Sequence, residues 1–433
     1  MAVRDRGPAG RRTLVAASVA VVVLTVASLW MAFAFLSPTP PHTIAMATDP
    51  EGSDSAELGK RYREILARDG IDLRLSPSAG AVENAARLRD PKSGIGVAII
   101  PGGITHRQES PGLVSLGTLF YEPLWFFYHG PRRKEKHESL RGLRISIGPE
   151  GSGTHALSLE LLARIGIIDR RSAKLLPLAP QAAAEKLLRG EIDAAVMLSS
   201  WESPVVQRLL AADNVNLANV TRADAYVALY PYLNKVVVPA GVGDMVKNRP
   251  PANVVLLAPK ASLVVRRDLH PAIQYLLLEA AAQIHSGPGM FRAAGRFPAP
   301  GSIDLPLSDN ASQFYKTGQP FLQRHLPFWL AVLAQQLLVL LIPVLGLLYP
   351  VLRFLPELYG WAMRRGVFRL YGDLKFLEEE LASRGAQDVA DLVARLDRLE
   401  DRASRLRSPV AFRPLLYTLR LHINLVRERL RKS

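Results

Sequence analysis

The chain has 433 residues and a net charge of +15, from 54 basic and 39 acidic residues. This length fits a two-lobed domain with additional segments, and the absence of cysteine excludes disulfides, thiolate metal sites and a lipoprotein anchor. The basic excess gathers in arginine clusters beside two apolar stretches, without an RNP-like pattern, zinc-ligand spacing or a basic recognition helix, so we expect no nucleic-acid partner.

The first apolar stretch, residues 13–36, carries no charge and follows a basic N-terminus of residues 1–12. At about 1.5 Å per residue it is long enough to cross a hydrocarbon core of roughly 30 Å. A cleaved signal peptide is the alternative, but the apolar region of a signal peptide is usually only about 7–15 residues long. We therefore expect an uncleaved signal anchor with a cytoplasmic N-terminus.

The second apolar stretch, residues 327–352, is also uncharged and is followed by an arginine cluster. Two glutamines and a proline interrupt it, which a transmembrane helix tolerates, and aromatic residues stand near its ends. A buried core helix is the alternative interpretation. The two stretches together predict a protein of the bacterial cytoplasmic membrane that contacts the lipid bilayer twice, with its main domain periplasmic or extracellular and its tail cytoplasmic.

Strand and helix patterns alternate between the two stretches, which predicts an α/β fold. Each expected strand leads into a polar, glycine-containing turn, and ligands bind at such strand ends in open α/β sheets. The order of the elements predicts a two-lobed extracytoplasmic solute-binding domain over residues 40–322. Lobe 1 is expected over about 42–124 and 235–310, and lobe 2 over about 125–234.

The most informative motif is a glycine-rich turn between a strand and a helix, where backbone N–H groups and hydroxyls could hold an anion. It lacks the Lys-Ser/Thr pair of a Walker A loop and the spacing of a dinucleotide-binding turn. An ordinary capped helix start is the alternative. The candidate ligand-binding residues in this turn are Gly151, Ser152, Gly153 and Thr154.

Further candidates lie in other strand-to-helix turns and at the crossover between lobes. Trp201 could lie against a ligand or pack between elements, and the aromatic residues after Tyr121 favour a core position. These candidates are Ser53, Ser78, Gly80, Asn84, Tyr121, Trp201, Ser203 and Pro204. Neither a G-x-S-x-G nor an H-E-x-x-H motif is present, so we expect no catalytic residue, no metal site and no cofactor.

Several blocks in this order resemble the TAXI family, whose members are solute-binding subunits of TRAP-type secondary transporters. The resemblance covers about residues 42–290, roughly 60% of the chain. Its blocks are LSPSAGAVENAARLRD (75–90), GVAIIPGG (96–103), LFYEPLWFFY (119–128), SLRGLRISIGPEGSGTHALSLELLARIGI (139–167), LLRGEIDAAVMLSSWESPVVQRLL (187–210) and YPYLNKVVVPAGVG (230–243).

The resemblance implies a type II periplasmic-binding-protein fold that closes on a small carboxylated solute, such as a dicarboxylate or an acidic amino acid. It also implies delivery to a separate multi-span permease. Three departures from the family pattern add acidic or bulky groups: the opening loop 49–54, Glu150, and Trp201 with Glu202. These departures favour a solute that also carries a cationic group, such as an amino acid, and they leave open a scaffold that has lost its ligand.

Residues 353–433 predict a cytoplasmic helical hairpin, because two segments with apolar residues at heptad spacing are separated by Ser408-Pro409. The hairpin could simply terminate the chain or dock on a permease or dimer partner. A transmembrane sensor that signals through this tail is the alternative to a transport function.

Overall fold

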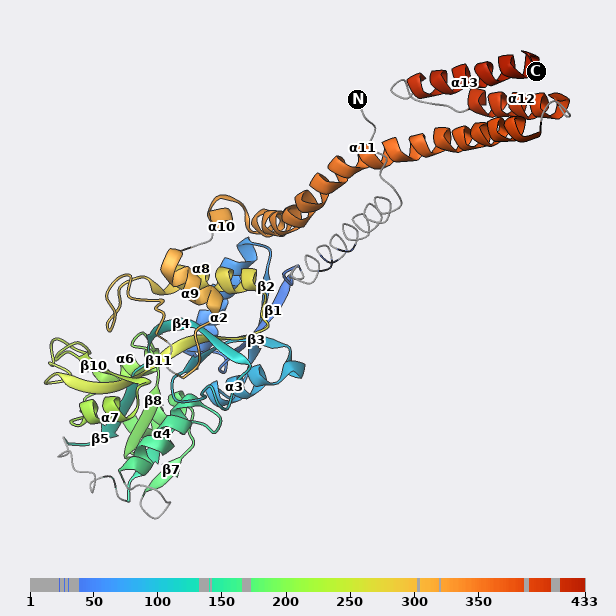
Figure 1. Cartoon of the computed structure of the whole chain (residues 1–433). Helices are drawn as coiled ribbons and strands as arrows, with labels where there is room; N and C mark the ends of the chain where they lie inside the picture. The colour runs from blue at the N-terminus through green and yellow to red at the C-terminus, as the bar shows by residue number, and fades with distance from the viewer. Residues whose placement is uncertain are drawn as a thin grey trace. The chain divides into compact units, whose positions relative to one another are not determined.

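The computed structural model describes residues 39–131, 140, 142–165, 173–301, 304–318, 321–384, 389–405 and 413–432, with three isolated positions before residue 31. The chain divides into two compact units (Figure 1). The main unit is Ser37–Gln335, and the tail unit combines Met1–Leu36 with Gln336–Ser433. The predicted N-terminus (1–12) and nearly all of the signal anchor (13–36) lie outside the described residues.

The first sheet of the main unit carries the order β10-β11-β3-β1-β2, with β4 also paired to β11. Strands β1, β2 and β3 are parallel, whereas β11 runs antiparallel to β3, β4 and β10. The strands are β1 (Thr43–Thr48), β2 (Asp72–Pro77), β3 (Ile95–Pro101), β4 (Leu113–Tyr121), β10 (Leu233–Val238) and β11 (Val254–Arg266). The helices are α2 (Asp54–Arg68), α3 (Ala81–Arg89), α8 (Pro271–His285) and α9 (Asp309–Thr317), with a 3-10 turn η1 (Pro91–Ser93).

The second sheet has the order β7-β6-β8-β5-β9. Its strands are β5 (Leu124–His129), β6 (Arg144–Ser146), β7 (Lys174–Leu176), β8 (Ala194–Leu198) and β9 (Val215–Leu217). Its helices are α4 (Gly153–Arg164), α5 (Pro180–Leu188), α6 (Pro204–Ala211) and α7 (Ala223–Leu229). The α/β class expected from the sequence is confirmed. Lobe 1 is the part of the main unit built on the first sheet, and lobe 2 is the part built on the second.

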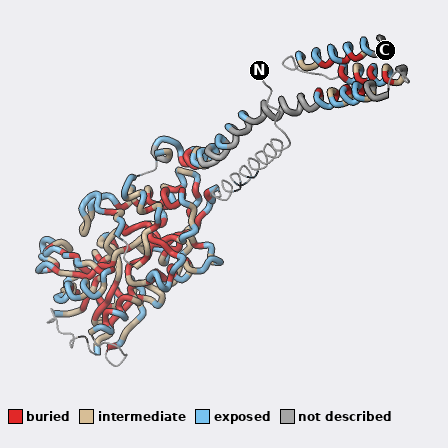
Figure 2. Tube along the Cα trace, in the orientation of Figure 1, coloured by how far each residue is buried: buried red, intermediate tan, exposed pale blue. Residues whose placement is uncertain are grey.

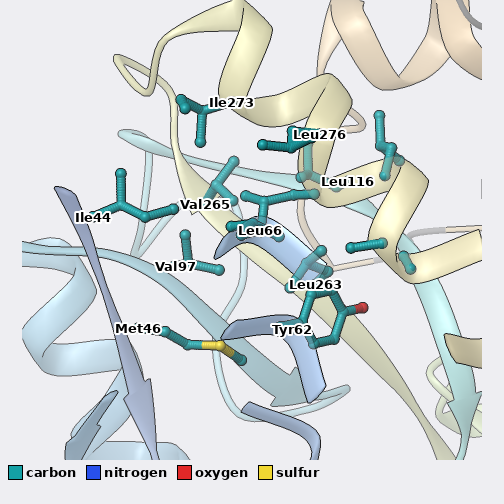
Figure 3. Packing of buried hydrophobic residues seen from close by; sticks show 14 of the residues in the cluster. Ile44, Met46, Tyr62, Leu66, Val97, Leu116, Leu263, Val265, Ile273 and Leu276 are labelled. Atoms are coloured by element: carbon teal, nitrogen blue, oxygen red, sulfur yellow. The ribbon is translucent and has the colours of Figure 1, made fainter. Parts of the chain in front are cut away.

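The core of lobe 1 forms because α2 and α8 turn apolar stripes toward the sheet (Figure 3). Tyr62 and Leu66 of α2 are fully buried, and they meet Met46 of β1 and Leu263 of β11. Burying one such side chain contributes about 1.5–3 kcal/mol. Lobe 1 therefore provides a rigid base for the loops at its strand ends.

Strand β11 contributes to the cores of both lobes. In its first half Val254, Leu256 and Ala258 pack into the core of lobe 2, and in its second half Leu263 and Val265 pack into the core of lobe 1. Where the chain first crosses between lobes, the Glu122 N–H donates to the Pro259 carbonyl of β11 at 3.0 Å. The first crossing between the lobes is thus hydrogen-bonded to the middle of β11, where that strand passes from one core to the other.

The main unit ends on the short helix α10 (Phe321–His325) and the first turns of α11 (Phe328–Arg384). Phe328 and Val332 pack into the core of lobe 1. The Trp329 indole stacks on His42 at 4.3 Å between ring centroids and donates to the Asp69 carbonyl at 2.9 Å. Among the described residues, no helix combines the length and the apolar character that a membrane crossing needs.

The tail unit contains one packed helix more than the predicted hairpin. Helices α12 (Val389–Arg405) and α13 (Arg413–Lys432) share a core with the C-terminal part of α11. Leu396 of α12 and Ile423 of α13 are fully buried there, against Leu374 of α11, which is nearly so. Figure 2 shows buried residues along all three helices of this core. Helix α11 continues without a break from the second apolar stretch, residues 327–352, into the tail.

Candidate functional site

The loops that follow the strand ends of the two lobes contact one another in the main unit. The Val82 N–H, at the start of α3 in lobe 1, donates to the Gly151 carbonyl of lobe 2 at 3.1 Å. Gly80 has a φ of 142°, and a Cβ atom there would lie 2.7 Å from the Ser152 Cα. Only glycine allows this approach without a shift of the backbone, so Gly80 brings the two lobes into direct contact.

The glycine-rich turn caps helix α4 as well as meeting lobe 1. The Ser152 hydroxyl accepts from the His155 N–H at 3.1 Å and donates to the Pro149 carbonyl at 2.6 Å. The Thr154 hydroxyl accepts from the Leu198 N–H at 3.0 Å, which ties α4 to the end of β8. In this structure both hydroxyls are engaged within the chain, as the capped-helix interpretation expects.

On lobe 1 a polar chain runs inward from the Ser78 turn. The Ser78 hydroxyl donates to the Asn84 side-chain oxygen at 2.6 Å, and the Asn84 amide donates to the Asp49 carboxylate at 2.8 Å. Asn84 is fully buried. Its hydrogen bonds therefore fix the Asp49 carboxyl at the end of β1, on the edge that faces lobe 2.

A carboxylate of lobe 1 also binds directly to lobe 2. Asp54, the first residue of α2, accepts from the Ser199 hydroxyl at 2.9 Å and from the Ser200 N–H at 2.7 Å. Both donors follow the C-terminal end of β8. Their loop is held by the Trp125 indole, which donates to the Ser199 carbonyl at 3.0 Å.

Three carboxyl groups gather at this boundary. Burial raises the pKa of Asp49 to about 6; the Asn84 hydrogen bond opposes the rise and the Asp54 charge adds to it. Burial, with the charges of Asp54 and Asp49, raises the pKa of Glu122 well above its ordinary value. Glu122 is surrounded by protein atoms yet keeps some accessible surface. Protonation of Asp49 and Glu122 therefore relieves repulsion of the Asp54 charge.

Several predicted site residues lie away from this contact. The Tyr121 hydroxyl accepts from Arg296 at 3.0 Å, and Trp201 packs against Trp125 and Phe291. Both aromatic rings are thus partly buried and pack against neighbouring side chains. Ser53 caps α2 through the Ala56 N–H, while Ser203 precedes α6 without a side-chain cap and Pro204 is its first residue.

The structure brings together six of the predicted residues. These are Ser78, Gly80, Asn84, Gly151, Ser152 and Gly153, of which Gly153 faces Ala81. Sequence reasoning missed Asp54, Glu122 and the Ser199–Ser200 pair as site residues. The acidic opening loop was the available signal for Asp54, but nothing in the sequence links it to donors 145 residues away.

Two other features do not coincide with this contact. A cavity of about 250 Å³ lies within lobe 2, lined mainly by apolar residues such as Phe126, Leu161 and Leu217, and it includes none of the predicted site residues. Within the described ranges, no three histidine or carboxylate side chains converge closely enough to hold a metal ion. The carboxyl groups at the lobe boundary are therefore not arranged as a metal cage.

Three solved structures of binding proteins match parts of this chain at low identity and low TM-score. The periplasmic aliphatic sulphonate-binding protein SsuA from Escherichia coli shares 14% identity, with a TM-score of 0.35 over 69% of this chain and 75% of that one. SsuA from Xanthomonas axonopodis pv. citri, bound to MOPS, shares 15% identity, with a TM-score of 0.33 over 57% and 74%. An ancestral arginine-binding protein bound to arginine shares 14% identity, with a TM-score of 0.33 over 56% and 92%.

A family model described as the NMT1-like family matches residues 55–317. This match includes most of both sheets and the loops that join the lobes. Membership of the TAXI family stays an expectation. The match spans more than half of the sequence, and the chain therefore belongs to the NMT1-like family.

Proposed function

We propose that the chain is the extracytoplasmic solute-binding subunit of a TRAP-type secondary transporter. It captures a small carboxylated solute, a dicarboxylate or an acidic amino acid, between its lobes. The observation that carries this proposal is the meeting of polar loops from the two lobes at their strand ends, where Val82 bonds to Gly151. Strand ends of this kind are where open α/β sheets bind ligands.

The helix starts at this contact suit an anionic solute. Helices α3 and α4 both begin there, one on each lobe, and helix N-termini carry partial positive charge and N–H donors. A hinge rotation about Glu122 and Pro259 would part the two loops and expose their donors to a solute. Closure would then bury the solute between groups from both lobes and exclude water.

The proposed receptor is anchored in the cytoplasmic membrane through residues 13–36 and 327–352, and it passes its solute to a separate multi-span permease. Support for the second anchor comes from the start of α11, where leucine side chains are about half exposed. Leu333, Leu337 and Leu341 are 50%, 56% and 52% exposed. A lipid environment would remove this apolar surface from water.

Thermal unfolding of the full chain in detergent, with dicarboxylates, keto acids and amino acids, tests solute capture. A ligand at 100 times its Kd adds about 2.7 kcal/mol to stability, which raises the Tm by a few degrees. Ser152→Trp fills the lobe contact and should abolish the rise. Leu159→Trp places the same side chain on an exposed position of α4 and should preserve it. A panel without any rise in the wild-type protein would argue against solute capture.

Alkaline extraction of membranes from expressing cells tests the anchors. The full chain should stay with the membrane fraction, and replacing residues 327–352 alone should still leave the first anchor in place. Release of the unaltered chain by alkali would refute anchoring by either segment.

A further inference from the structure

The Ser199–Ser200 loop presents two hydrogen-bond donors that converge on a single point. The Ser199 hydroxyl and the Ser200 N–H both bond to one oxygen, Oδ2 of Asp54, at 2.9 and 2.7 Å. The loop is held independently of that oxygen by two other hydrogen bonds. The Ser199 carbonyl accepts from the Trp125 indole, and the Ser199 N–H donates to the Pro123 carbonyl at 3.3 Å. Two fixed donors on one oxygen form a site for a carboxylate.

The occupant of these donors comes from the other lobe. Asp54 begins α2 of lobe 1, and Ser199 follows β8 of lobe 2, so the bond spans the boundary where a solute would lie. Asp54 is only partly buried, and its side chain can turn to solvent when the lobes part. Repulsion from the carboxyls of Asp49 and Glu122 opposes the stabilisation that Asp54 gains from the two donors and from the N-terminus of α2.

We propose that Ser199 and Ser200 form a carboxylate-binding subsite, and that Asp54 occupies it here in place of the carboxylate of a solute. This inference rests on the proposed function for its solute. It deepens that function by naming the groups that bind the solute's carboxylate. The chain therefore closes on itself without a solute. A solute must displace Asp54, so its apparent affinity is lowered by the fraction of molecules in which Asp54 holds the subsite.

The experiment uses the full chain in detergent and follows the separation of the lobes. The sequence contains no cysteine, so cysteines placed at exposed Arg63 on α2 and Glu185 on α5 can be spin-labelled specifically. Pulsed dipolar spectroscopy then gives the distance distribution between the lobes. The probe for the subsite is acetate, the simplest carboxylate with an apolar remainder, and methylammonium is the cationic control.

Asp54→Ala should lengthen and broaden the distance distribution, and millimolar acetate should restore the short distances. Asp54→Asn keeps an acceptor oxygen and should remain closed. Glu57→Ala removes an acidic residue from the same first turn of α2 without touching lobe 2, and it controls for helix stability. In Asp54→Ala with Ser199→Ala, closure should need at least about tenfold more acetate, because one donor to a charged group is lost.

Three results would overturn the inference. These are a closed Asp54→Ala variant, an open variant that methylammonium closes and acetate does not, and an acetate response unchanged by Ser199→Ala. None of these results bears on the thermal unfolding test of solute capture, which uses the unaltered chain and larger solutes. A wild-type chain that binds nothing, together with an acetate-rescued Asp54→Ala, would retain the subsite and reject solute capture.

Discussion

At the scale of single residues, the lobe boundary combines acidic side chains with hydroxyl and amide donors. Within the described parts of the chain, no basic side chain pairs with Asp49, Asp54 or Glu122. Burial therefore favours the protonated form of two of these carboxyls, and hydrogen bonds hold the third. This effect leads to a prediction about pH.

The Asp49 carboxyl should make folding less favourable as the pH rises. Its pKa is about 6 in the folded protein against an ordinary value of 3.8, so its contribution is fully present below pH 3.8 and is lost as the pH rises to 6. The loss is at most about 3 kcal/mol. Asp49→Asn can keep the Asn84 hydrogen bond and should match the wild type at pH 4 and exceed it at pH 7. Chemical denaturation at each pH measures the difference.

A buried histidine also makes stability depend on pH, so the stability of Asp49→Asn must be compared with that of the wild type at each pH. Burial, with the charges of Arg292 and Arg61, lowers the pKa of His285 to about 3. The stability from its neutral ring is present above pH 6.5 and is lost as the pH falls, opposite to the Asp49 effect. Because His285 is the same in both proteins, it cancels in the difference. A stability difference between Asp49→Asn and wild type that stays constant from pH 4 to 7 would contradict the assignment.

The sequence predicted part of the candidate site at this scale. Ser78, Gly80 and Asn84 belong to one strand-to-helix turn, and Gly151 and Ser152 to another, so local pattern was sufficient to find both. The Asp54 bond to Ser199 could not be found in this way, because it depends on the relative placement of two lobes. Tyr121 and Trp201 pack against other aromatic side chains, and packing between elements was the alternative interpretation for Trp201.

At the scale of elements, the starts of α3 and α4 determine how closely the lobes approach. Gly80→Ala places a Cβ atom 2.7 Å from the Ser152 Cα at a φ of 142°, so the two helix starts must separate. Exchange of the Val82 amide hydrogen, which is bonded to Gly151, should accelerate at least about tenfold. Hydrogen exchange resolved at Val82 measures this.

Gly94→Ala is the matched control for that substitution. Gly94 also has a positive φ, of 71°, but a Cβ atom there meets no other atom within 4 Å. It should cost about 1 kcal/mol of backbone strain and leave the exchange of Val82 nearly unchanged. Equal acceleration by both alanines would mean that general destabilisation, rather than contact between the lobes, controls the Val82 amide.

Element types followed from the sequence more readily than element lengths and partners. Alternating strand and helix patterns predicted an α/β fold, and heptad spacing predicted α12 and α13. The length of α11 did not follow, because it continues past Pro350 and Pro356, where proline normally disfavours a helix. The third helix of the tail core was therefore missed, since its apolar residues, Val367 to Leu377, lie in neither of the two segments with heptad spacing.

At the scale of the whole molecule, the main unit begins and ends on lobe 1. Trp329→Ala removes the stacking on His42 and the hydrogen bond to Asp69. We expect a loss of about 2 kcal/mol in the free energy of unfolding of the main unit. Urea unfolding followed by hydrogen exchange in α2 and β2 measures it.

Leu330→Ala serves as the comparison, because Leu330 is the next residue of α11 and is 53% exposed. It should change the free energy of unfolding by less than about 0.5 kcal/mol. Similar losses from both substitutions would show that the helix start is stabilised by α11 as a whole rather than by the Trp329 contacts.

The pairing of His42 with Trp329 also makes the main unit an insertion cassette. His42 and Trp329 bring the two ends of the unit together. The unit can therefore be inserted into a host protein without added linkers. Residues 42–329 could be transplanted between two adjacent segments of another protein, such as the halves of a fluorescent reporter. The separation of the lobes would then be read as a change in the host's signal.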